Sequence, residues 1–61
     1  MNKEEIKNCW LHLGAYETLG MYSIRGNLDA LLYCSSLARN KYEQELVKLE
    51  IKSAVFMEAN K

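Results

Sequence analysis

The chain has 61 residues, of which 49% are hydrophobic, and its eight basic residues balance its eight acidic residues. This length allows one domain over residues 1–61, and the balanced charge leaves no long-range field that would draw the protein onto nucleic acid or anionic lipid. Residues 1–7 are charged and unlike a secretion signal, and no apolar run approaches the about 20 residues that cross a bilayer, so we expect a soluble cytoplasmic protein that does not associate with a membrane.

A first helix is predicted over residues 3–25. Asn2 and Glu5 have the spacing of a capping box, in which each side chain accepts a hydrogen bond from the backbone N–H of the other residue. Apolar residues follow at helical spacing from Ile6 to Tyr22. They cover a broad surface of the helix rather than a single stripe.

A turn is predicted at residues 25–27, followed by a second helix over residues 27–59. Gly26 can take the positive φ that ends a helix, and Asn27 can cap the next one. Helices joined by so short a turn pack antiparallel. Polar side chains gather around Asn40, so a break there, which would give a three-helix mini-bundle, is the alternative. Because no Gly or Pro forces that break, we expect the second helix to be continuous.

The second helix carries apolar residues on two opposite faces. The faces are offset by two residues, which is about 200° around a helix. A helix that is apolar on two sides must lie between neighbours, and in so short a chain one neighbour is expected to be another chain. The first row, at alternating spacings of four and three, is Leu28, Leu32, Ser35, Arg39, Tyr42, Leu46, Leu49, Ser53 and Phe56; the second row is Ala30, Tyr33, Leu37, Asn40, Gln44, Val47, Ile51, Ala54 and Glu58.

The fold expected from these rows is all-α: an antiparallel helical hairpin that dimerises into a four-helix bundle. The first row packs against the first helix, with Tyr42 also in the core and with Leu28, Leu32, Leu46, Leu49 and Phe56 meeting Ile6, Trp10, Leu13 and Tyr16. The second row meets a second chain, and the predicted oligomer interface is Tyr33, Leu37, Val47, Ile51 and Ala54.

Residues suited to catalysis are sparse. General acid–base and nucleophilic catalysis need at least two polar groups held in a pocket that excludes water, and His12 is the only histidine. It lies three residues from Cys9, but a zinc site needs three or four ligands. Cys9 and Cys34 lack the dense spacing of a disulfide framework and are interpreted as reduced core thiols. We therefore expect no enzymatic activity, no cofactor and no bound metal.

Basic side chains form a candidate partner or nucleic-acid face that consists of Arg39, Lys41, Lys48 and Lys52. Its lysines alternate with Glu45 in a solvated ladder of side chains three and four residues apart, and Glu43 and Glu50 form a separate acidic line. In an antiparallel dimer these lines could set the register by pairing opposite charges, as flanking charges do in coiled coils. The basic row could instead contact phosphates, although Glu45 interrupts it.

In its length and expected hairpin layout the chain resembles the small plasmid-encoded hairpins that dimerise into four-helix bundles and bind RNA. As a short, proline-free, charge-balanced chain it also resembles small bacteriophage-encoded proteins that act by occupying a host protein. We expect a non-enzymatic protein-binding module that forms a homodimer and occupies a larger intracellular protein as an inhibitor or adaptor. The alternative is a dimeric nucleic-acid-binding hairpin that uses Arg39, Lys41, Lys48 and Lys52.

Overall fold

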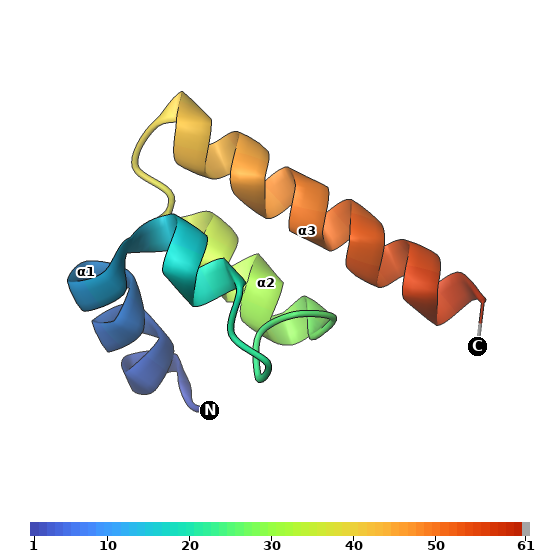
Figure 1. The fold of residues 1–61 in the computed structure, drawn as a ribbon, viewed down its shortest axis with the longest axis horizontal. Coiled ribbons are helices and arrows are strands. Elements are labelled where there is room, and N and C mark those ends of the chain that lie inside the picture. Colours follow the sequence, from blue (N-terminus) through green and yellow to red (C-terminus); the bar gives the residue numbers. More distant parts are fainter. Residues whose placement is uncertain (61) are drawn as a thin grey trace.

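A computed structural model describes residues 1–60, which form three α-helices with no β-strand among them. The helices are α1 (Lys3–Leu19), α2 (Leu28–Leu37) and α3 (Lys41–Ala59). Each helix contacts the other two, and Figure 1 shows α3 lying across the top of α1 and α2. The Cα radius of gyration is 10.8 Å, which matches one compact chain of this length. The predicted all-α class is confirmed, and over the described residues no helix has the length and apolar character needed to cross a membrane.

The second helix breaks, so the predicted hairpin is wrong and the alternative arrangement of three helices is found. The helix expected over residues 27–59 is interrupted at residues 38–40. The Asn40 side chain accepts a hydrogen bond from the backbone N–H of Glu43 at 2.9 Å, and the Glu43 carboxylate accepts one from the backbone N–H of Arg39 at 2.8 Å. These bonds satisfy backbone groups that the start of a helix would otherwise leave unpaired. The break therefore needs neither Gly nor Pro.

The first helix begins as predicted but ends earlier. Asn2 and Glu5 form the capping box, in which Asn2 Oδ1 accepts from the Glu5 N–H at 2.8 Å and Glu5 Oε1 accepts from the Asn2 N–H at 3.2 Å. The helix ends at Leu19 instead of residue 25, and residues 20–26 form a succession of turns and bends. The connection between the first two helices is therefore longer than the predicted turn.

The start of α2 matches its predicted signals. Gly26 has a positive φ of 74°, which glycine adopts without strain. Asn27 caps α2, and its Oδ1 accepts a hydrogen bond from the Ala30 N–H at 3.2 Å. Ile24, in the turns just before, is fully buried. Burial of this side chain anchors the connection to the core.

A bend at Gly14 divides α1 into two halves. Gly14 has φ 87° and ψ 172°, a combination that is essentially restricted to glycine. The Thr18 hydroxyl donates a hydrogen bond to the Gly14 carbonyl oxygen at 2.7 Å, and Thr18 is fully buried. Figure 1 shows the two halves of α1 running in different directions. The second half carries Tyr16 and Leu19 to a pocket that it shares with α3.

The core lies where the three helices meet, and its buried members are Ile6, Trp10, Ala15, Leu19, Ile24, Ala30, Leu31, Cys34, Val47 and Ala54. The apolar members of the second row therefore lie inside the chain or partly buried at its edge, and the first row lies largely outside. Leu32, Leu49 and Phe56 of the first row are 59%, 62% and 69% exposed. The break explains why the two rows are not placed as predicted, because α2 and α3 fold back against each other and both turn the apolar residues of the second row inward.

The predicted burial of the first row against the first helix is found only in part. Ile6 and Trp10 are buried as predicted, and Leu28 and Leu46 are partly buried against the core. Leu32, Leu49 and Phe56 are exposed instead, and so are Leu13, Tyr16 and Tyr42. These side chains lie on the surface of the protein.

Candidate functional site

One face of α3 presents apolar side chains to solvent. It consists of Tyr42, Leu46, Leu49, Ser53 and Phe56, and we call it the α3 stripe. Tyr42, Leu49 and Phe56 are 65%, 62% and 69% exposed, whereas Leu46 is partly buried. The members alternate spacings of four and three residues, which aligns them along one side of the helix. A row of this kind suits contact with another helix.

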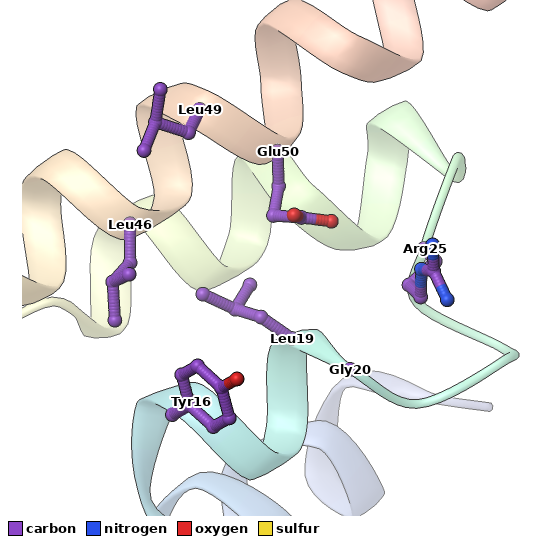
Figure 2. A pocket seen from close by; sticks show the side chains of 7 residues that line it. All are labelled: Tyr16, Leu19, Gly20, Arg25, Leu46, Leu49 and Glu50. Carbon is purple, nitrogen blue, oxygen red and sulfur yellow. The ribbon is translucent and has the colours of Figure 1, made fainter.

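A pocket opens beside the middle of the α3 stripe, between α3 and the second half of α1. It has a volume of about 250 Å³ and is lined by Tyr16, Leu19, Gly20, Arg25, Leu46, Leu49 and Glu50. Figure 2 shows Leu46 and Glu50 reaching from α3 towards Leu19. Small-molecule sites are usually larger, at about 300–1,000 Å³. The pocket has room for a side chain of a protein partner rather than for a drug-sized ligand.

The wall of this pocket carries one charge of each sign. Arg25 comes from the connection between α1 and α2, and Glu50 comes from α3. Figure 2 shows Arg25 on the side of the pocket formed by that connection. Because the two formal charges cancel, the pocket has no strong preference for an anion or a cation. Contact with its leucine side chains is the main attraction that it offers.

Charged residues border the α3 stripe on both edges. The outer edge, which faces away from the core, carries Glu45 and Lys52, and both are exposed. Lys48 Nζ lies 3.8 Å from Glu45 Oε1, and the two side chains are 73% and 57% exposed. Such exposed pairs contribute about 0–1 kcal/mol, so Glu45 can exchange this partner at little cost.

The inner edge of the stripe, which faces the core, carries Glu43 and Glu50. Glu43 is 8% exposed and Glu50 is half-buried. Glu43 Oε2 also lies 3.8 Å from Arg39 Nη2. The acidic line predicted from the sequence therefore lies on the side of α3 that is nearer the core of the chain.

The residues predicted to meet a second chain lie against this chain's own core. Val47 and Ala54 are each 1% exposed, and the partly buried members are Tyr33, Leu37 and Ile51. The Lys3 ammonium also lies 5.7 Å from the centroid of the Tyr33 ring. The apolar face of α3 that is exposed is the α3 stripe, which was predicted to lie in the interior.

The basic face is interrupted by carboxylates. Lys41, Lys48 and Lys52 share one side of α3 with Glu45, and Arg39 lies in the break before that helix. Arg39 and Lys48 each have a glutamate oxygen 3.8 Å away. These ion pairs reduce the positive charge that the face presents.

Burial makes Cys34 a weak nucleophile. Its side chain is fully buried, and desolvation raises the pKa of the thiol to about 11, so the reactive thiolate is disfavoured at neutral pH. Cys9 is half-buried and His12 is exposed. Over residues 1–60, no three His, Cys, Asp or Glu side chains are grouped in a way that could hold a metal ion.

Comparison of the chain with protein-family models, curated protein sequences and solved structures found no match. The functional assignment therefore depends on the α3 stripe and its pocket.

Proposed function

We propose that the chain is a small non-enzymatic protein-binding module that self-associates and acts by occupying a larger cytoplasmic protein, as an inhibitor or adaptor of the kind that bacteriophages encode. The exposure of the α3 stripe carries this proposal, because Tyr42, Leu49 and Phe56 are 65%, 62% and 69% exposed on one helix face. Aromatic and large aliphatic side chains gathered on one face are typical of surfaces that proteins use for association.

The pocket adds a place for a partner to anchor. Most of the binding energy of an interface comes from a few side chains that fill well-packed pockets. The pocket shares Leu46 and Leu49 with the α3 stripe, and Tyr16, which is 72% exposed, lines its other side. A partner helix lying along the stripe can place one apolar side chain in this pocket.

The cysteines support the cytoplasmic part of the proposal. Cys9 and Cys34 are free thiols, and Cys34 lies in the core of the chain. Free thiols are typical of cytosolic proteins, because the cytosol keeps cysteines reduced.

Capture of a partner by matched variants tests the proposal. Leu49→Lys places a charge in the middle of the α3 stripe, and Leu32→Lys makes the same change at a leucine of similar exposure on α2, 59% against 62%. Each tagged protein is incubated with a lysate of its source cells while salt is raised from about 50 to 200 mM, a range over which phosphate contacts lose much of their affinity. Circular dichroism checks that both variants are folded.

We expect the wild type and Leu32→Lys to retain the same discrete protein at every salt concentration and Leu49→Lys to lose it. Equal retention by Leu49→Lys would show that the stripe is not the binding face. Recovery of nucleic acid that elutes as the salt rises would support the alternative instead, a nucleic-acid face that consists of Arg39, Lys41, Lys48 and Lys52.

A further inference from the structure

We propose that a second copy of this chain covers the α3 stripe, with the two α3 helices antiparallel and Glu45 of each copy facing Lys52 of the other. This inference rests on the proposed function, because it names the occupant of the binding face when no target is bound. It starts from the alternating spacing of four and three residues between Tyr42 and Phe56. That spacing lets two helices pack along a shared seam.

The sizes of the stripe residues favour one register, that is, one alignment of the two antiparallel α3 helices. Each step up one antiparallel helix is a step down the other, so placing Leu46 opposite Leu49 of the second copy also places Tyr42 opposite Ser53. The largest side chain of the stripe then faces the smallest, which allows the layers to interdigitate without a void. The two leucine layers lie at the centre of the contact, beside the pocket that Leu46 and Leu49 line.

The charges on the outer edge select the same register. With Leu46 opposite Leu49, Glu45 faces Lys52 of the second copy, and the twofold symmetry forms this contact twice. Both side chains are exposed next to the stripe. A shift of seven residues in one direction would place Glu45 opposite Glu45, and a shift in the other direction would place Lys52 opposite Lys52. Repulsion between like charges therefore disfavours both neighbouring registers.

Parallel pairing is disfavoured by charge as well. In a parallel pair, an outer-edge residue of one helix faces the inner-edge residue five positions later in the other helix. That geometry places Glu45 against Glu50 on both sides of the seam. The antiparallel register replaces these two repulsive contacts with two attractive ones.

The inner edge carries two acidic residues, and one of them forms an ion pair with an arginine of the same chain. The proposed register brings Glu43 near Glu50 of the second copy. Glu43 is 8% exposed and lies 3.8 Å from the Arg39 guanidinium, and Glu50 lines a pocket that also contains Arg25. Because the ion pair with Arg39 already offsets the charge of Glu43, its approach to Glu50 of the second copy costs less than contact between like charges on the outer edge.

Charge reversal tests the register. E45K turns each proposed pair into two cations and K52E turns it into two anions, so each variant should raise the dissociation constant of the dimer about tenfold. The double variant E45K/K52E exchanges the two charges and should return the constant to the wild-type value. An equimolar mixture of the two single variants should form a heterodimer. Sedimentation equilibrium of the full chain at several concentrations measures all four.

The matched control is K48E. Lys48 pairs with Glu45 within the chain at 3.8 Å, but its position on α3 lies outside the stripe and its two edges. Its reversal should break the internal pair and leave the dissociation constant unchanged. A loss of dimer in this control equal to that in E45K would overturn the register.

The outcomes separate this inference from the proposed function. A wild type that stays monomeric at every concentration would overturn both the register and self-association, whereas capture of a target by the stripe is decided by Leu49→Lys. A wild type that dimerises together with an equally dimeric E45K, or with an E45K/K52E that is not restored, would overturn the register and leave self-association standing.

Discussion

The carboxylate of Glu43, in the first turn of α3, accepts a hydrogen bond at 2.8 Å from the backbone N–H of Arg39, which lies in the break between α2 and α3. Its other oxygen lies 3.8 Å from the Arg39 guanidinium, so these two residues are joined through both backbone and side chain. Glu43 is 8% exposed and the hydrogen bond is partly buried, and a partly buried backbone N–H that lacks a partner is costly. This contact stabilises the break that separates the three-helix fold from a hairpin.

Glu43→Ala should lower the free energy of unfolding by about 1–3 kcal/mol, because a partly buried N–H loses its acceptor. Glu17→Ala removes an exposed carboxylate from α1 and should change that free energy by less than about 0.5 kcal/mol. Urea denaturation followed by the fluorescence of Trp10, the only tryptophan and 2% exposed, measures both variants. Equal losses in the two would mean that the break does not depend on Glu43.

Asn40→Ala should destabilise the protein by about 0.5–2 kcal/mol, the usual cost of removing an N-cap side chain. Asn40 accepts the Glu43 N–H at 2.9 Å at the start of α3. Asn8→Ala, at an exposed position inside α1, is the control and should be neutral or slightly stabilising, since alanine is the better helix former. Thermal unfolding followed by circular dichroism measures the difference. A variant at Asn40 as stable as the wild type would contradict a role for this cap.

Gly14→Ala should destabilise the protein by about 1–3 kcal/mol, because φ 87° and ψ 172° are strained for a residue with a Cβ atom. The cost comes from the backbone alone, since nothing lies within 4 Å of the added carbon. Gly20→Ala is the matched control, with φ −82° and its nearest neighbour, the Glu17 carbonyl oxygen, at an ordinary 3.5 Å. It should be neutral or stabilising by up to about 1 kcal/mol. A Gly20→Ala variant that is less stable in urea than Gly14→Ala would contradict the strained backbone conformation at Gly14.

Stability should fall at alkaline pH because of Cys34. Burial raises the pKa of its thiol from 9.0 to about 11, so the unfolded chain loses this proton at a lower pH than the folded chain does. The resulting stabilisation is complete below pH 9 and is lost as the pH rises towards 11. The free energy of unfolding should therefore decrease more steeply over this range in the wild type than in Cys34→Ala. Parallel curves for the two proteins would contradict the shift.

Local hydrogen-bond signals predicted the starts of the first two helices. Asn2 with Glu5, and Gly26 with Asn27, act as expected because each signal depends on residues within about one turn of helix. The spacing of Asn2 and Glu5 recurs in Asn40 and Glu43. That recurrence was the available signal for the break, but local hydrogen bonds are only one part of the balance between one long helix and two packed ones.

Which apolar face is exposed could not be predicted in the same way. The first and second rows have the same helical spacing, so periodicity does not say which one is buried. Leu49 and Val47 are both apolar and lie two residues apart, yet Leu49 is 62% exposed and Val47 is 1% exposed. The difference in exposure depends on whether another helix packs against each residue, and the residues of that helix are distant along the chain.

The sequence by itself determined that the chain is all-α, where its first two helices begin, and that its C-terminal half is apolar on two faces, because these properties depend on residues within a few turns of one another. Only the tertiary structure decided that α2 and α3 are separate and that Val47 and Ala54 face inward while Leu49 and Phe56 face solvent. The physical reason is that burial depends on contacts between whole helices. Folding α3 back onto α2 covers one of the two apolar faces and leaves the other exposed to solvent.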